Sequence, residues 1–325
     1  MGSREWHWQE RGKAWYGVGI YHVTMVVPSR EPLLGRLEIP EQDPKKAYVE
    51  RTELGNALVR ELYVMSKHYP DIRILQYCLM PDHLHAIIHV TREMDTSIRS
   101  VLRGFWQGAK RLGRAYILSL DTELYSEHPN TAAPFPIFTE QPFIRALTHQ
   151  GQLQTMYDYI RINPQRLATK RVFQELFYVQ EDIEISGRKY KGVGNAELLL
   201  RARYMPVHVR RTMMDDAEKH GDDSALREYM NNCVIAARQG MVMVSPFISK
   251  YEKAILDVLL REELPFIYIA DNGFGDYYKP HGKLFDAVAN KRAMILSPWE
   301  YNADKKKVSR DECVMMNKMA EEIAG

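Results

Sequence analysis

The chain has 325 residues, 45% of them hydrophobic and 26% charged, and its formal net charge is +2 at pH 7. This is the composition of a globular protein with room for two domains, and the near-neutral charge excludes a strongly basic nucleic-acid-binding chain, so any such function must rest on local charge. Because there is no apolar run approaching the ~20 residues of a membrane span, no signal-peptide core and only three widely spaced cysteines, we expect a cytoplasmic protein.

The spacing of apolar residues predicts a mixture of strands and helices in the first half of the chain. The expected elements are a strand over 16–27, a Pro-rich connection to about 43, a helix over 44–68, strands over 72–79 and 83–90, a helix over 97–117, a loop around 128–137 and a helix over 149–163. A fourth strand is expected at either 135–138 or 142–147. This order predicts an α+β domain, an antiparallel sheet covered by helices.

His83 and His85 stand two positions apart in a segment with strand character. Successive side chains of a strand point to opposite faces, so the two imidazoles emerge together, roughly 7 Å apart along the backbone, while Leu84 turns into the core. Such a pair can hold one divalent cation. Without further signals, histidines in a strand are more often ordinary core or surface residues, and we expect His89 to be structural.

Tyr159 and Asn163 lie four residues apart in the last of the predicted helices. They therefore share one helix face, about one turn apart, and Pro164 pushes the residue before it out of helical geometry. The phenol and the amide can thus address the same point. Tyr157 is a local competitor, but four residues after it stands Arg161 instead of an amide, so we expect Tyr157 to pack or to contact a nucleic acid.

The helix expected over 97–117 has two unlike faces. Its apolar residues recur at a helical period and predict a core-facing stripe: Ile98, Val101, Leu102, Phe105, Ala109, Leu112 and Tyr116. The other face carries the basic strip, defined here as Arg99, Arg103, Trp106, Lys110 and Arg114. Cations and an aromatic ring suit a single strand of nucleic acid, whose phosphates need charge and whose bases need a stacking surface. The same pattern also fits a solvated helix face with an incidental tryptophan.

Beyond about residue 175, short apolar runs alternate with helices, which is typical of a parallel sheet with Rossmann-like winding. The runs are 241–245, 265–270 and 293–297, with a helix near 282–290 and another at the end of the chain. Two Ser-x-x-Glu patterns, at 249–252 and 309–312, predict capped helix starts. The loops 245–249 and 271–275 lie where such sheets usually bind ligands, and Gly273 and Gly275 are expected to be turn glycines.

Two motifs together resemble the HUH single-tyrosine transposases, most closely the REP-associated (IS200-like) branch. The chain reads Pro-Asp-His-Leu-His-Ala-Ile-Ile from Pro81 and Tyr-Ile-Arg-Ile-Asn-Pro from Tyr159, in the family's order and at about its separation. The resemblance covers about residues 15–175. Asp82 stands where relatives often have Asn, which adds a carboxylate beside the first histidine.

The resemblance implies a metal-dependent endonuclease and strand transferase that acts on single-stranded DNA and recognises hairpin-forming repeats. Tyr159 is then the nucleophile that becomes joined to a 5′ phosphate, and His83, His85 and Asn163 hold the cation. Imidazole and oxygen ligands suit Mn²⁺ well and Mg²⁺ acceptably when phosphate adds oxygens. In this context the basic strip is expected to contact DNA. Related enzymes can complete each active site with a neighbour's tyrosine helix, so a homodimer is one expected assembly.

By the same resemblance, residues 1–175 form the transposase domain with a ferredoxin-like sheet. Residues 176–325 form a smaller Rossmann-like α/β domain, similar to SLOG domains related to the DNA-processing protein A family, on the evidence of Ser-Pro-x-Ile-Ser from Ser245 and Asn-Gly-Phe from Asn272. Neither a Walker nor a G-x-G-x-x-G motif is present. Two alternatives remain: a non-catalytic single-strand nucleic-acid-binding protein, and a nucleotide sensor that acts through the C-terminal domain.

Overall fold

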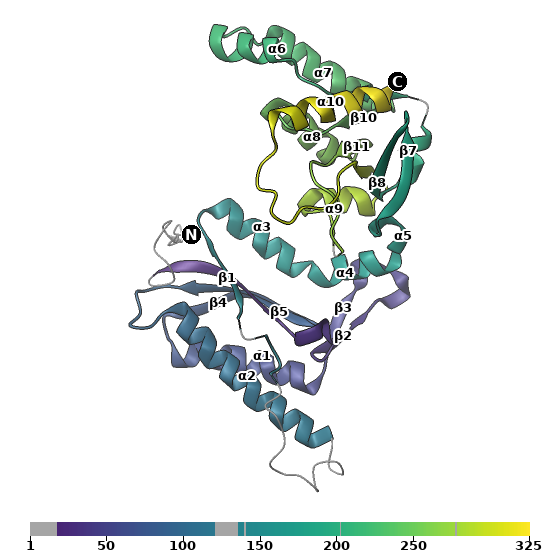
Figure 1. The fold of residues 1–325 in the computed structure, drawn as a ribbon. Helices are drawn as coiled ribbons and strands as arrows, with labels where there is room; N and C mark the ends of the chain where they lie inside the picture. The colour runs from purple at the N-terminus through teal and green to yellow at the C-terminus, as the bar shows by residue number, and fades with distance from the viewer. Residues whose placement is uncertain (1–17, 121–135, 140, 202, 277) are drawn as a thin grey trace. The chain divides into compact units, whose positions relative to one another are not determined.

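The computed structural model describes residues 18–120, 136–139, 141–201, 203–276 and 278–325 (Figure 1). The chain divides into two compact units, the first ending at Val172 and the second beginning at Phe173. None of the helices in these ranges combines the length and apolar character that a membrane span requires.

The first unit is built from strands and helices in the order β-α-β-β-α-β, with a small hairpin inserted before the first helix. Its elements are β1 (Gly19–Val26), β2 (Gly35–Glu38), β3 (Tyr48–Arg51), α1 (Glu53–His68), β4 (Ile72–Met80), β5 (His83–Val90), α2 (Ile98–Leu120), β6 (Phe143–Leu147), α3 (Gln150–Arg161) and α4 (Asn163–Val172), with short 3₁₀ turns at Pro28–Arg30, Pro40–Gln42 and Pro44–Lys46. The fourth sheet strand is therefore the second of the two candidates, 142–147.

Four of these strands form one antiparallel sheet in the order β4-β5-β1-β6. In its register Thr24 lies opposite His85, and His22 lies opposite Ile87 on one side and Arg145 on the other. The strand that carries the two histidines is thus an interior strand. This is the α+β arrangement that the sequence predicts.

The two faces of this sheet pack against different helices, as Figure 1 shows. Leu84, Ala86 and Ile88 of β5 face α1 and α2, in a core that also holds the predicted apolar stripe of α2. Ile87 of β5 faces α3, where it packs with Leu153 and Ile160. Since side chains alternate along a strand, His83 and His85 lie on the α3 face.

The prediction of a helix over 44–68 is wrong at its start. Tyr48–Arg51 is strand β3, paired antiparallel with Gly35–Glu38, and the helix begins only at Glu53. The reason is local: the Thr52 side chain accepts a hydrogen bond from the Gly55 backbone N–H and caps the helix there. The Pro-rich connection expected up to about residue 43 also contains a strand, β2, which the sequence pattern does not predict.

The prediction that Pro164 forces Asn163 out of helical geometry is also wrong. The residue that leaves helical geometry is Ile162 (φ −98°, ψ 11°), and Asn163 is the first residue of α4, with Pro164 in its first turn. Proline is well tolerated in a first turn, where no earlier carbonyl needs its missing N–H. The helix expected over 149–163 is present as α3, and a second helix, α4, begins at Asn163.

The second unit is a mixed sheet between two helical layers. Its elements are α5 (Gln174–Phe177), β7 (Gln180–Ile185), β8 (Arg188–Gly194), a 3₁₀ helix (Ala196–Leu200), β9 (Tyr204–Pro206), α6 (Arg211–Asp215), a π turn (Asp216–His220), α7 (Ser224–Arg238), β10 (Val242–Ser245), α8 (Lys250–Arg261), β11 (Phe266–Ile269), α9 (Gly282–Ala289), β12 (Ala293–Ser297) and α10 (Arg310–Ala324).

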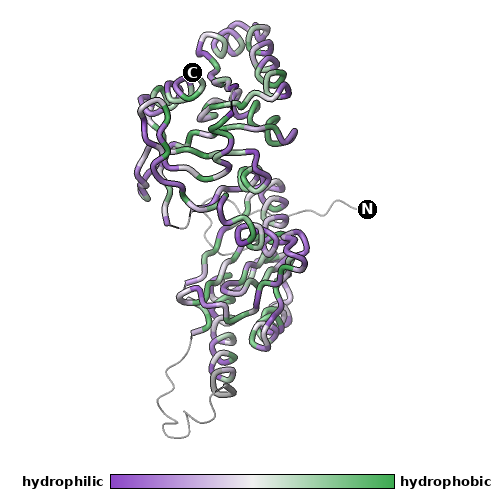
Figure 2. The backbone as a smooth tube through the Cα atoms, turned by 90° about the vertical axis from the view of Figure 1, so that its right-hand side faces the viewer, coloured by the Kyte–Doolittle hydropathy of each residue, from purple (hydrophilic) through white to green (hydrophobic). Residues whose placement is uncertain are grey.

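The strand order of this sheet is β7-β8-β12-β11-β10-β9, in which β9 to β12 are parallel and the β7–β8 hairpin is antiparallel to β12. One face packs on α7, α8 and α9, and the other on α10. Figure 2 shows that hydrophobic residues gather in the interior of each unit, whereas the helices alternate between hydrophobic and hydrophilic residues. Both predicted capping boxes are present, at the starts of α8 and α10.

Candidate functional site

His83 and His85 open strand β5, directly after a turn that neighbouring backbone holds in place. Val27 donates its N–H to the Asp82 carbonyl oxygen and Leu34 donates to that of Pro81, each at 2.9 Å. The two imidazole rings lie edge to face, with centroids 4.7 Å apart. The sheet therefore presents the pair on one face, as the alternation of side chains predicts.

Each of these two imidazoles engages its Nδ1 with a partner. His83 Nδ1 donates to the Asp82 carboxylate at 2.6 Å, and His85 Nδ1 lies 2.9 Å from the Thr24 hydroxyl oxygen. In His83, Nε2 is then the nitrogen suited to a metal ion, because a ligating histidine usually donates its other N–H to a carboxylate or another oxygen.

Asp82 is held in its charged form by its surroundings. Burial raises the pKa of its carboxyl group, but the hydrogen bond and charge of His83, followed by the charge and hydrogen bond of Arg30, outweigh burial and lower the pKa overall. Arg30 lies 3.3 Å from the carboxylate. A carboxylate that stays ionised is a strong acceptor for the His83 N–H.

His22 is a third imidazole at this place that the sequence reasoning missed. Its Nε2 lies 3.2 Å from His85 Nδ1, and the ring is buried with 6% of its surface exposed. Burial, with a smaller effect from the Arg145 charge, lowers the pKa of His22 to about 4, so this imidazole is neutral at physiological pH. A signal existed: His22 and Thr24 are polar residues two positions apart in an otherwise apolar strand, the same spacing as His83 and His85.

Tyr159 reaches this cluster from α3, far along the chain. Its ring centroid lies 5.7 Å from that of His85, edge to face. The guanidinium carbon of Arg166, on the following helix α4, lies 5.6 Å from the centroid of the Tyr159 ring. The sequence reasoning missed Arg166, because the two residues lie on different helices. The competing Tyr157 is 38% exposed.

Asn163, the first residue of α4, is buried with 6% of its surface exposed. Its amide nitrogen has no hydrogen-bond partner within the described part of the protein. Leaving a buried polar group unsatisfied costs roughly 1–3 kcal/mol, so this N–H donor is suited to an acceptor that the protein chain does not supply, whereas only the amide oxygen could bind a cation.

The residues present fit a cation, although not as a closed cage. Within the described ranges no three histidine, cysteine or carboxylate side chains are close enough to hold a metal ion among themselves. Two imidazoles and an amide would leave several coordination positions open, as a catalytic metal requires and a structural metal does not. The donor set therefore suits an ion that also binds a substrate.

The basic strip of α2 does not join this cluster, because α2 packs on the opposite face of the sheet. Trp106 is half-buried, and its Nε1 donates to the Phe138 carbonyl oxygen at 3.1 Å. The Lys110 ammonium lies 5.3 Å from the centroid of the indole. Beside them, α2 and the edge strand β6 form a groove of about 450 Å³. It is lined by Arg99, Leu102, Arg103, Trp106, Gln107, Gln141, Pro142 and Ile144.

Three of the four cations of this strip are exposed. Arg99, Arg103 and Arg114 are exposed, and Arg99 and Arg103 line the groove. The Trp106 ring lines the same groove, but it is partly buried and is therefore not a fully exposed stacking surface.

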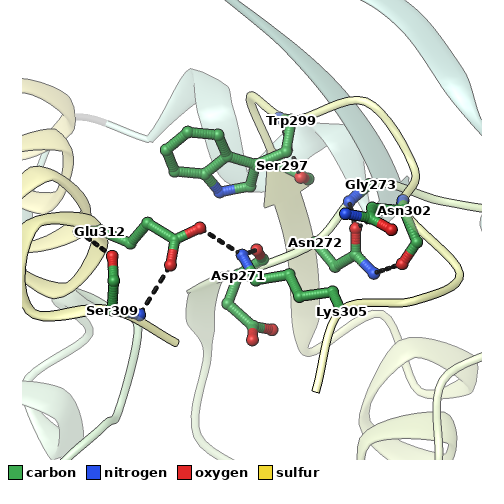
Figure 3. A network of polar contacts seen from close by, with 9 residues as sticks. All are labelled: Asp271, Asn272, Gly273, Ser297, Trp299, Asn302, Lys305, Ser309 and Glu312. Carbon is green, nitrogen blue, oxygen red and sulfur yellow. Dashed lines mark hydrogen bonds and ion pairs between the residues drawn. The ribbon is translucent and has the colours of Figure 1, made fainter. Parts of the chain in front are cut away.

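In the second unit, the loops after β11 and β12 bond to each other (Figure 3). The Asn272 amide oxygen accepts the N–H groups of Gly273 and Asn302, and its amide nitrogen donates to the Asn302 carbonyl oxygen. Lys305 donates to the Asp271 carbonyl oxygen and to the Glu312 carboxylate. The hydrogen bond from Lys305, helped by the Ser309 cap, lowers the pKa of Glu312 to about 2. The polar groups expected to meet a ligand thus bond within the chain.

Gly273 is not the turn glycine that the sequence suggests. Its backbone does not have a positive φ, but a Cβ at this position would lie 2.4 Å from the Tyr301 backbone nitrogen. The glycine is therefore required by close approach of two loops.

No family model matches the chain, and no curated protein matches it. Among solved structures it is similar to a REP-associated tyrosine transposase bound to a REP hairpin, with 16% sequence identity and a TM-score of 0.29, over 50% of this chain and 73% of that chain. It is also similar to a protein from Deinococcus radiodurans R1 that is provisionally described as a transposase, with 14% identity and a TM-score of 0.25, over 47% of this chain and 96% of that chain. Similarity at this level does not establish an activity, so function has to be inferred from the side chains of the site.

Proposed function

We propose that the chain is a metal-dependent endonuclease and strand transferase for single-stranded DNA, a transposase of the HUH single-tyrosine kind. The observation that carries the proposal is the meeting of two motifs from distant parts of the sequence: the His85 and Tyr159 rings lie 5.7 Å apart, with His83 beside them. Tyr159 is the nucleophile, and His83, His85 and Asn163 are the cation ligands.

The proposed fold assignment agrees with this function. The order β-α-β-β-α-β, with strands paired as β4-β5-β1-β6, supports a ferredoxin-like sheet for the first unit. The parallel strands β9 to β12, separated by helices on one face, support a Rossmann-like second unit. Its role in the reaction is left out of the proposal, since its strand-end loops bond to each other.

In the proposed reaction, Tyr159 Oη attacks the phosphorus of the scissile phosphodiester. The new P–Oη bond forms, the bond to the 3′ oxygen breaks, the phenol proton passes to solvent and the 3′ oxygen leaves as a hydroxyl group. A bound Mg²⁺ or Mn²⁺ would stabilise negative charge on a non-bridging phosphate oxygen. A free phenol has a pKa near 10, so a tyrosine nucleophile needs a base or a cation to help remove its proton.

The covalent bond to Tyr159 retains the reactivity of a phosphodiester. A 3′ hydroxyl can therefore attack the phosphotyrosine and rejoin strands without ATP. The proposed substrate is single-stranded DNA with a hairpin-forming repeat, and the basic strip on α2 is proposed to hold part of it by phosphate contacts. A homodimer remains one assembly in which this chemistry could occur.

The proposal is tested by incubating the full chain and Mn²⁺ with a panel of 5′- and 3′-labelled hairpin-tailed oligonucleotides. We expect a protein–DNA adduct on a denaturing gel, carried by the 3′-labelled product, and a released product with a 3′ hydroxyl. Tyr159→Phe should abolish the adduct, and Tyr157→Phe, two residues away on the same helix, should keep it. Equal adduct in both variants, or cleavage by Tyr159→Phe at the wild-type rate, would refute Tyr159 as the nucleophile.

A further inference from the structure

We propose that His22 and Thr24 are positioning residues that hold the His85 ring with its proton on Nδ1, so that Nε2 presents its lone pair to the cation. This inference rests on the proposed function and adds to it two residues on a strand that neither motif includes. Both act through His85 and neither touches the metal ion.

The sheet brings the two side chains to His85 by register. Strand β1 runs antiparallel to β5, and Thr24 is the direct partner of His85. His22 is two residues away on β1, so it shares the sheet face of Thr24 and lies diagonally across from His85. Both strands are interior strands of the sheet.

The distances allow two arrangements of protons among the three groups. Two neighbours approach the same nitrogen: the Thr24 oxygen at 2.9 Å and His22 Nε2 at 3.2 Å from His85 Nδ1. Only one proton can lie between the two facing ring nitrogens. If it were on His22, His85 Nδ1 would be an acceptor, and the neutral His85 ring would carry its proton on Nε2 and could not bind a metal there.

We assign the proton to His85 Nδ1, the arrangement in which Nε2 can act as the ligating nitrogen. The N–H then donates to the Thr24 oxygen and to the lone pair of His22 Nε2. His83 reaches the same tautomer by a different route, since its Nδ1–H donates to Asp82. The two proposed ligands are thus oriented by different groups: His83 by the Asp82 carboxylate, and His85 by the neutral Thr24 and His22 side chains.

The contacts also argue against His22 as a ligand itself. Its Nε2 faces His85 Nδ1, and no three of the histidine, cysteine and carboxylate side chains in the described ranges are grouped closely enough to hold a metal ion. Arg145, the partner of His22 on β6, adds a nearby positive charge that disfavours a cation at His22.

The test is side-chain ¹H–¹⁵N NMR of the metal-free full chain, with Mn²⁺ affinity measured by calorimetry. In the wild type we expect the His85 resonances of an Nδ1–H ring. In Thr24→Val and His22→Phe we expect a mixture of tautomers and Mn²⁺ binding weakened by about 10- to 100-fold, as for other losses of a group that orients a metal ligand. Thr24→Ser should restore both properties.

Thr91→Val is the matched control, because it removes a hydroxyl at the other end of β5 that donates to the Asp71 carbonyl oxygen. It should leave the His85 tautomer and the Mn²⁺ affinity unchanged, and backbone NMR spectra will report whether each variant is folded. A wild-type His85 with its proton on Nε2, or folded Thr24→Val and His22→Phe variants with wild-type tautomer and affinity, would overturn the inference. An Nδ1–H ring that responds to both substitutions, in a protein that forms no DNA adduct, would support the positioning role and refute the nuclease.

Discussion

At the scale of single residues, the candidate site is defined by how its buried polar atoms are satisfied. His83 and His85 each have an Nδ1 partner supplied by the chain, Asp82 and Thr24 respectively. The buried amide nitrogen of Asn163 lacks one among the described residues. Native proteins rarely leave such groups unsatisfied without a functional reason.

Asn163→Leu separates a ligand role from a structural one. Leucine has nearly the same shape, and no hydrogen bond of the amide nitrogen is lost, so we expect the free energy of unfolding to stay within about 1 kcal/mol of the wild type. Mn²⁺ affinity should fall by at least about tenfold. Urea denaturation and calorimetry measure the two quantities.

Gln165→Leu, two residues along α4, serves as the control with the opposite pattern. Its Nε2 donates to the Ala47 carbonyl oxygen at 3.0 Å, so the variant should lose about 1 kcal/mol of stability and keep its Mn²⁺ affinity. If Asn163→Leu binds Mn²⁺ like the wild type, Asn163 is not a ligand.

Asp82→Asn tests the carboxylate beside His83 through the pH dependence of stability. The pKa of Asp82 is lowered in the folded chain, so its contribution is present above the unfolded value of about 3.9 and is lost as pH falls further through the folded pKa. In metal-free protein, the variant should therefore be less stable than the wild type near neutral pH, and the difference should close below pH ~4.

Thermal unfolding across this pH range, in the presence of a chelator, gives the measurement. Asp95→Asn, at an exposed aspartate, should follow the wild type at every pH. A stability difference between Asp82→Asn and wild type that does not depend on pH would mean that the charge of Asp82 is not what stabilises the turn.

At the scale of elements, the sheet of the first unit separates the two surfaces that we propose to be functional. Helix α3 covers the face with the histidines, and α2 covers the opposite face and carries the basic strip on its outer side. The groove at the β6 edge is one path by which a DNA strand could reach both surfaces. We therefore expect α3 to contribute to the cleavage reaction and α2 to the affinity for DNA.

Arg103→Ala should weaken the binding of a single-stranded oligonucleotide and reduce its salt dependence. Removing one phosphate contact lowers the slope of log K against log salt by about 0.7 for a single strand. Arg111→Ala is the control on the same helix, because Arg111 lies 3.7 Å from Glu61 and outside the groove. Fluorescence anisotropy at several salt concentrations tests both, and equal slopes for the two variants would remove α2 from the DNA-binding surface.

The Ser-x-x-Glu pattern occurs at two helix starts whose surroundings differ. The capping boxes of α8 and α10 have the same geometry. Glu252 is buried, and its two carboxylate oxygens accept backbone N–H groups from Val209, Ile248 and Ser249. Glu312 instead bonds Lys305 near the surface. The sequence pattern is the same in both caps. Only the fold shows that the Glu252 cap also binds a distant segment at Val209, whereas the Glu312 cap binds Lys305 in the preceding loop.

At the scale of the whole molecule, the chain consists of two units with separate cores. The first unit has apolar clusters on both faces of its four-stranded sheet. The second has its own clusters on both faces of its six-stranded sheet. Two layers around a complete core are what a domain needs to fold independently.

We therefore expect residues 173–325 to fold when expressed alone, with a cooperative urea transition followed by circular dichroism. Residues 1–172 should likewise fold and should retain adduct formation with Mn²⁺ and hairpin-tailed DNA. An unfolded C-terminal fragment would show that its core depends on the rest of the chain. A folded N-terminal fragment that forms no adduct, beside an active full chain, would give the second unit a part in the reaction.

The sequence by itself determined the elements whose signal is local. Strand β5, the apolar stripe of α2, the parallel strands β10 to β12 and both capping boxes follow from periodicity and from side chains that bond their own neighbours. The two histidines share a face because strand geometry requires it. Local signals failed where a distant partner decides, as in the β2–β3 hairpin and at Gly273, whose neighbour is Tyr301.

Only the tertiary structure decided which distant side chains meet. Sheet pairing sets Thr24 opposite His85 and brings His22 beside it, and the packing of α3 brings Tyr159 to the same place. The sheet also separates the basic strip from this cluster. No periodic pattern or residue spacing in the sequence indicates these contacts. Strand order and helix packing depend instead on burying apolar surface across the whole unit.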